Sequence, residues 1–151
     1  MHSRRGLTLI EIVITVAIIG IVSGVYFLVA NPAGQVQGAR NSRRSLDLQN
    51  IMLAIRQNIA DGGTGTFTCS SGSVPTSTKT MTSAGGGYNI APCLIPTYLA
   101  TMPIDPGTTT AYYNSPTDYN TAYTIVYNSA SGTITLSAPA AELKKTISIT
   151  R

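Results

Sequence analysis

The sequence is poor in the residues on which most enzymes and metal sites depend. Its 151 residues include no Trp, one His, two Cys and only 11% charged residues. One His and two Cys are too few for the common structural zinc sites, which take four such ligands. The low charge density also excludes a disordered polyelectrolyte and a histone-like binder of nucleic acid, although the net charge is +4. We therefore do not expect a cytosolic enzyme.

The charges that are present avoid one long segment, Leu7 to Ala30, where Glu11 is the single charged residue. As a helix this segment would span about 36 Å, which exceeds the hydrocarbon core of a bilayer at about 30 Å. Arg4 and Arg5 precede it, and positive charge before a span keeps that end in the cytoplasm. The pattern predicts a transmembrane helix with the rest of the chain outside.

Two simpler interpretations of this segment compete. A secretory signal peptide has an apolar region of only about 7–15 residues and seldom contains a carboxylate. A plain transmembrane anchor explains everything except Glu11.

Glu11 needs a specific reason, because a charged side chain inside a membrane span costs about 2.5–3.5 kcal/mol on insertion scales. No basic residue follows it before Arg40. If the chain were cut after Gly6, the new amino group of Leu7 would lie one helical turn before Glu11. That ammonium could pair with Glu11 of its own chain or of a neighbouring chain.

These residues resemble a known signal. Arg4-Arg5-Gly6, then Leu7-Thr8-Leu9-Ile10-Glu11 and an apolar run, are similar to the class III leader of type IV pilins and pseudopilins. The resemblance implies that prepilin peptidase cuts after Gly6 and that Leu7 becomes the N-methylated terminus. It also implies that Glu11 pairs with the N-terminus of an adjacent subunit during assembly. Leu7 departs from the family in standing where Phe is commonest.

Small residues mark one part of the apolar helix. Gly20 and Gly24 form a GxxxG spacing, and Ala17 lies on a neighbouring part of the helix surface. Such residues allow helices to approach closely, so we expect them at a helix-packing surface. The alternative is a chance spacing, since small residues are common in membrane helices.

A second, amphipathic helix half is predicted after Asn31-Pro32, where we expect a kink. One stripe of apolar residues follows helical spacing, and Asp61-Gly62-Gly63 ends the helix: Leu48, Ile51, Met52, Ile55 and Ile59. The resemblance implies an α+β pilin fold, in which a long bent N-terminal helix packs on a small antiparallel sheet. The expected parts are a cleaved leader at 1–6, helix halves at 7–30 and 31–61, and a loop-rich head at 62–151.

Arg40, Arg43 and Arg44 form the one basic cluster. No aromatic residues alternate with them, as a stacking platform for single-stranded nucleic acid requires. We therefore expect a solvated turn, or one that faces lipid headgroups, and no nucleic-acid partner.

The head begins with a segment rich in Thr, Ser and Gly, from Gly62 to Met102, that we interpret as a long connecting loop with one short strand near Tyr88. Cys69 and Cys93 lie in it, and an external location permits one disulfide between them. Closing a loop of this length would stabilise the fold by about 3.5 kcal/mol on the chain-entropy model.

The rest of the head predicts an antiparallel sheet. Met102-Pro103-Ile104-Asp105-Pro106-Gly107 is a turn signature, and segments rich in β-branched and aromatic residues follow it. The expected strands are Ala111–Asn114, Tyr119–Tyr127 and Gly132–Ala138, with an edge strand at Thr146–Thr150 guarded by Lys144 and Lys145.

No cofactor, metal or catalytic residue is predicted. Major pseudopilins bind calcium in an acidic loop, but Asp105, Asp118 and Glu142 are widely spaced here. His2 would leave with the leader. There is no nucleophile motif and no phosphate-binding loop.

The resemblance implies a structural subunit that forms a helical homo-oligomer, a filament, after contact with prepilin peptidase and an inner-membrane assembly platform. Its precursor would lie in the inner membrane, and the filament would be an extracellular pilus or would span the periplasm. The alternatives are a pseudopilin of a type II secretion or competence system and a single-span anchored binding domain that does not polymerise.

Overall fold

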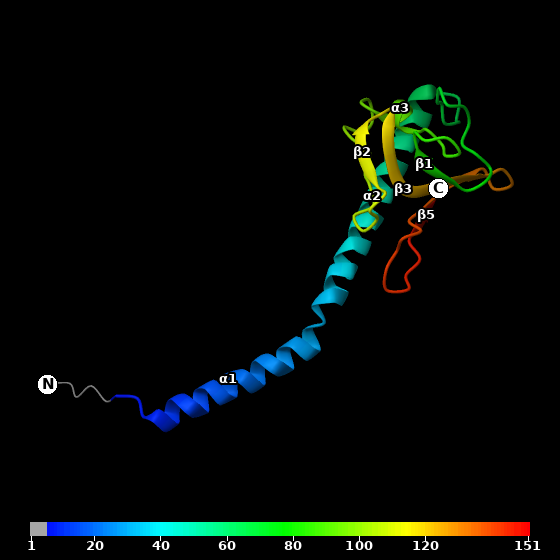
Figure 1. The fold of residues 1–151 in the computed structure, drawn as a ribbon. Coiled ribbons are helices and arrows are strands. Elements are labelled where there is room, and N and C mark those ends of the chain that lie inside the picture. Colours follow the sequence, from blue (N-terminus) through cyan, green and yellow to red (C-terminus); the bar gives the residue numbers. More distant parts are fainter. Residues whose placement is uncertain (1–5) are drawn as a thin grey trace. The chain divides into compact units, whose positions relative to one another are not determined.

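A computed structural model describes residues 6–151, with the backbone alone at residues 27–30. Arg4, Arg5 and His2 lie outside the described residues. The chain divides into two compact units, Met1–Val36 and Gln37–Arg151, and each is described by itself (Figure 1).

The first unit contains helix α1 (Leu9–Ala30), which is apolar on every side. Its large apolar side chains from Leu9 to Tyr26 are exposed. This stretch is long and apolar enough to cross a membrane, and none of it is buried within the described chain. A helix with no polar face and no cover needs an apolar medium or another apolar surface.

The predicted kink is a break of one residue at Asn31. Its backbone is left-handed, with φ 35° and ψ 65°, a conformation that Asn tolerates better than most residues. The Asn31 side-chain oxygen then accepts a hydrogen bond from Gly34 N at 3.2 Å, so the same residue caps the next helix. Pro32, whose missing N–H costs nothing at a first helical position, begins that helix, α2 (Pro32–Gly62).

Within the second unit, α2 packs its apolar stripe against a sheet. Leu48, Ile51 and Ile55 are fully buried, as their spacing predicts. The helix ends at Gly62, and Gly63 has the positive φ that commonly follows a helix.

The sheet has five antiparallel strands, with β3 at its centre. The strands are β1 (Lys79–Thr82), β2 (Tyr112–Ser115), β3 (Asp118–Asn128), β4 (Thr133–Ser137) and β5 (Ser148–Thr150). β1 and β4 pair with β3, β2 pairs with its first residues, and β5 pairs with β4 as the predicted edge strand. Alternate residues of β3, such as Tyr119 and Tyr123, point into the core against α2. The α+β fold class is therefore confirmed.

The interpretation of Gly62 to Met102 as a connecting loop was incomplete. This segment contains β1 and a short helix, α3 (Ala91–Leu94). The strand expected near Tyr88 is only a single bridge with Met81. β1 is four residues long and forms by pairing with β3, a partner about 40 residues away, so local sequence carries little sign of it.

The interpretation of the basic cluster was wrong for Arg44, whose side chain is only 1% exposed. It donates to both carboxylate oxygens of Asp105, at 2.7 and 3.0 Å, and to Glu142 at 2.9 Å. Arg40 also pairs with Glu142, and Arg43 pairs with Asp47. One guanidinium thus ties α2 to two loops that are distant in the sequence.

This network shifts the pKa values of its acids. Burial alone would raise the pKa of Asp105, but its hydrogen bonds with Arg44 hold it below the ordinary value. The hydrogen bond from Arg44 also lowers the pKa of Glu142. Asp47 behaves in the opposite way, because its burial raises its pKa despite a 3.0 Å hydrogen bond from Tyr123.

We predict that Arg44→Met lowers the free energy of unfolding of the head by about 3–5 kcal/mol, because it leaves the buried Asp105 carboxylate without a cation. Arg40→Met is the matched control: its pair with Glu142 is partly exposed on both sides, Glu142 keeps its pair with Arg44, and loss of such a pair costs less than about 1 kcal/mol. Thermal unfolding of the full chain in micelles, followed by near-ultraviolet circular dichroism, compares the two.

The lowered pKa of Asp105 gives the same test a pH dependence. The contribution of Asp105 to the free energy of unfolding is present above its unfolded pKa of about 3.9, and it is lost as the pH falls through the lower pKa of the folded state. The stability difference between wild type and Arg44→Met should therefore shrink in acid. Equal melting temperatures for the Arg44 and Arg40 variants at neutral pH would contradict this account.

Candidate processing and assembly site

The bond between Gly6 and Leu7 lies just before α1, outside any helix or strand. Both residues are exposed, and a Cβ added to Gly6 would meet no atom within 4 Å. The bond is therefore open to an enzyme. Since the chain itself has room for a side chain at residue 6, a requirement for glycine here would come from the enzyme that cuts the chain.

Thr8 and Glu11 start the helix together. The Glu11 N–H donates to the Thr8 side-chain oxygen at 3.3 Å and to the Thr8 carbonyl at 3.1 Å. Thr8 is thus the N-cap, and Glu11 is the third residue of the first turn. The positive end of the helix dipole lies here and favours a carboxylate. Sequence reasoning missed this role of Thr8, although the Thr-x-x-Glu spacing is that of a capping box.

The Glu11 carboxylate is exposed and has no ion pair within residues 6–151. In contrast, the other hydroxyl nearby is used inside the helix: Thr15 donates to the carbonyls of Glu11 and Ile12, at 3.0 and 2.8 Å. The charge of Glu11 is therefore the polar feature of this turn that is left for a partner.

The proposed packing residues Ala17, Gly20 and Gly24 are all exposed on α1. A Cβ at either glycine would meet nothing within 4 Å. Nothing in the described chain makes use of their small size, so the GxxxG spacing stays a prediction about contacts with other molecules.

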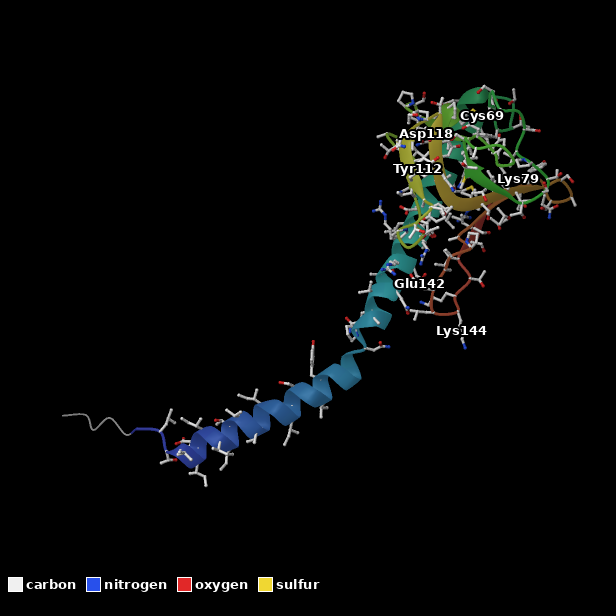
Figure 2. The ribbon with its side chains drawn as sticks, in the orientation of Figure 1. Cys69, Lys79, Tyr112, Asp118, Glu142 and Lys144 are labelled. Atoms are coloured by element: carbon white, nitrogen blue, oxygen red, sulfur yellow. A yellow bond between two sulfur atoms is a disulfide. The ribbon has the colours of Figure 1, made fainter. Side chains whose placement is uncertain are left out.

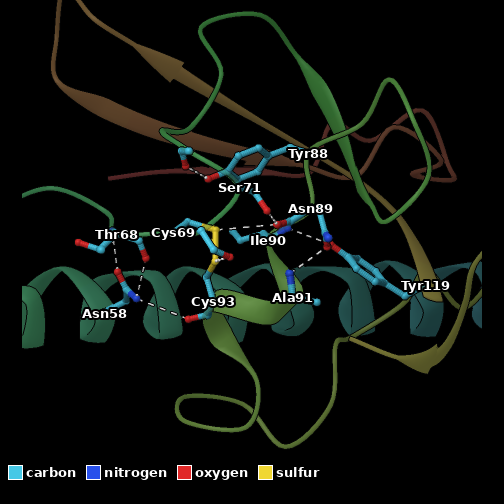
Figure 3. Close-up of a disulfide and its surroundings, with 12 residues drawn as sticks. Asn58, Thr68, Cys69, Ser71, Tyr88, Asn89, Ile90, Ala91, Cys93 and Tyr119 are labelled. Atoms are coloured by element: carbon cyan, nitrogen blue, oxygen red, sulfur yellow. Dashed lines mark hydrogen bonds between the residues drawn. A yellow bond between two sulfur atoms is a disulfide. The ribbon is translucent and has the colours of Figure 1, made fainter. Parts of the chain in front are cut away.

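Cys69 and Cys93 form a disulfide in the head (Figure 3). Asn58 of α2 holds both arms of the loop that it closes: its amide donates to the Thr68 carbonyl at 3.2 Å and accepts from Thr68 N–H at 2.9 Å. The same amide group donates to the Cys93 carbonyl at 3.5 Å. The loop is thus fastened to the helix as well as to itself.

Tyr119 supports the same region from the sheet. Its hydroxyl oxygen accepts the N–H groups of Ile90 and Ala91, at 2.9 and 3.1 Å, where α3 begins (Figure 3). Burial raises the pKa of this phenol, while the hydrogen bonds at Ala91 and Ile90 act in the opposite direction. Asn58 and Tyr119 were not predicted, although Asn58 continues the buried stripe of Ile51 and Ile55.

The carboxylates of the head do not make a metal site. Asp105 and Glu142 are far apart in the sequence, but both accept hydrogen bonds from the Arg44 guanidinium, one on each side of it. Asp118 lies elsewhere in the head, at the start of β3 (Figure 2). Among the described residues, no group of three or more His, Cys, Asp or Glu side chains could hold a metal ion.

Comparison with known proteins identifies the N-terminal segment. Residues 1–27 match a family model described as the prokaryotic N-terminal methylation motif, the class III prepilin leader of type IV pilins and pseudopilins. No curated protein and no solved structure matched the chain. The motif and the apolar helix are typical of the membrane-anchored precursors of pilin-like proteins and pseudopilins, and they point to a structural subunit.

Proposed function

We propose that this chain is the structural subunit of a type IV pilus-like filament. Prepilin peptidase cuts the precursor after Gly6, and the amine of Leu7 is then methylated. The mature chains polymerise through α1. The observation that carries the proposal is an apolar helix that no other part of the described chain covers from Leu9 to Tyr26, which begins within a methylation motif and has one carboxylate in its first turn.

Either the lipid bilayer or other α1 helices can cover α1, and the chain passes from the first to the second during assembly. Before assembly the bilayer covers it, with the leader in the cytoplasm and the head outside, as Arg4 and Arg5 favour. On leaving the bilayer, the helices bury one another in the filament core. Apolar contact alone gains little when a helix moves from lipid to other helices, so close approach at Ala17, Gly20 and Gly24 is needed.

Glu11 gives neighbouring α1 helices a defined register, which apolar packing alone does not specify. Inside a membrane or a filament core its charge is costly, and a Leu7 ammonium of an adjacent subunit offsets that cost. Because an unpaired carboxylate is penalised there, the pair favours one register of helix against helix. A pseudopilus of a secretion or competence system would use the same chemistry and is the alternative within this class.

We predict that Gly6→Leu leaves the precursor uncut, because a side chain at residue 6 would obstruct the peptidase while the chain itself accommodates it. The measurement is the gel mobility of the protein from cells that contain the peptidase. A shift equal to that of wild type would disprove the leader assignment. Leu7→Phe, which brings the sequence closer to the family pattern, should be cut normally and serves as the control.

We predict that Glu11→Gln is cut but yields at least about tenfold fewer filaments, since it keeps the shape and removes the charge that pairs with the amine. Thr15→Val is the control: the Thr15 hydroxyl bonds only to its own helix, so filaments should persist. Filaments are counted by electron microscopy after processing is verified. Wild-type numbers from Glu11→Gln would remove the ion pair from the mechanism. A wild-type chain that is cut and never polymerises would favour the anchored binding domain.

A further inference from the structure

A cavity of about 670 Å³ lies in the head, between the last turns of α2, the segment that follows it, and the hairpin where β3 ends and β4 begins. Its walls are largely apolar: Met52, Ile55, Ile59, Phe67, Val74 and Ile134. The volume falls in the range of binding cavities, about 300–1,000 Å³. An apolar hollow of this size on a head with a small core is a place where an apolar group from outside can be buried.

Two arginines, Arg56 and Arg151, also line the cavity. They differ from the other arginines in the described residues, because Arg40, Arg43 and Arg44 each pair with an acid. Neither Arg56 nor Arg151 has an ion pair within residues 6–151. No Asp or Glu side chain lines the cavity. The chemistry fits an occupant that carries a carboxylate beside an apolar group, since a guanidinium binds carboxylates with two donors.

The head has one surface of that kind away from the cavity, the turn between β2 and β3. Asp118 is exposed there, and its carboxylate accepts a hydrogen bond from Asn114 at 2.9 Å, which leaves further lone pairs free. Tyr112 lies beside it, 40% exposed, and Figure 2 places both on the side of the head away from Lys79.

The other Asp and Glu residues of the head cannot supply the carboxylate that binds Arg56 and Arg151. Asp47 and Asp105 are buried, and Glu142 is held by Arg40 and Arg44. Asp61 directly follows Ala60, which lines the cavity, so its Cα lies only about 3.8 Å from that of a cavity residue and it cannot belong to a separate second surface.

Strand β3 separates the turn from the cavity. Asp118 is its first residue, whereas Tyr127, near its other end, lines the cavity. Ten residues of strand correspond to about 30 Å, so the turn cannot reach the cavity of its own chain. A contact that joins two different surfaces of identical chains is heterologous, and when it does not close into a ring it propagates as a helical filament.

We propose that the cavity receives the β2–β3 turn of a second copy of this chain. The Asp118 carboxylate of one copy binds Arg56 and Arg151 of the next, and the Tyr112 ring packs on the apolar wall. This contact rests on the proposed filament function and adds a head-to-head contact to the packing of α1.

Thiol cross-linking tests the contact in filaments of the full chain. In the variant Thr117→Cys/Ser73→Cys, which keeps Asp118 and both arginines, a short bismaleimide should join each copy to the next and give a ladder of multimers on a denaturing gel. Thr117 is exposed beside Asp118, and Ser73 is exposed and lines the cavity. The matched control is Thr117→Cys/Lys144→Cys, because Lys144 is exposed and does not line the cavity. It should stay monomeric. Filaments of the first variant that remain monomeric after treatment would overturn the contact and leave the filament function standing.

Charge exchange provides a second test that does not depend on the cysteine variants assembling. Asp118→Arg should lower filament yield at least about tenfold, because like charges would face each other in the contact. Adding Arg56→Asp and Arg151→Asp should restore the yield. An unchanged yield from Asp118→Arg would overturn the contact and assign the cavity to another occupant. A wild-type chain without filaments would overturn the proposed function itself.

Discussion

The lack of any cover for α1 is the constraint on which the rest of this protein depends. From Leu9 to Tyr26 its side chains are mostly apolar and all are exposed, and no residue of that stretch is buried within the described chain. Such a helix must lie in lipid or against other apolar helices. The methylation motif at residues 1–27 agrees with both, since precursors of this type begin in a membrane and pilins leave it to assemble. Glu11 is the one charged residue of this helix, and its carboxylate needs a partner both in lipid and among packed helices.

The chain also has a part that lies in water, and it changes from the apolar helix α1 to the amphipathic helix α2 over a few residues around Asn31. Asn31 ends α1 with a left-handed backbone and caps α2 with its side chain. Beyond it, α2 carries an apolar face only on the side that meets the sheet. Asn41 and Arg44 begin that buried face. Arg44 binds Asp105 and Glu142, so two loops are tied to the helix close to where apolar packing starts. The Cys69–Cys93 disulfide and Asn58 do the same near its other end.

Periodic features could be predicted from the sequence, and pairings between distant residues could not. The apolar run, the stripe of Leu48, Ile51 and Ile55, and the strands after Ala111 each leave a local pattern. Arg44 was misplaced because its partners lie 61 and 98 residues further along the chain. Its position could have been inferred, since residue 44 precedes Leu48 by four and so continues the buried stripe. β1, α3 and the cavity depend on tertiary contacts that no local pattern encodes.

The mass of the N-terminal peptide of the mature protein, taken from filaments, tests the central claim most directly. The account predicts that the peptide begins at Leu7 and carries one methyl group on its α-amine, so that an ammonium lies just before α1, four residues ahead of Glu11 in the sequence. A peptide that still begins at Met1, or that begins beyond Glu11, would contradict it, because no cleaved amine would then lie at the start of α1 to pair with that carboxylate.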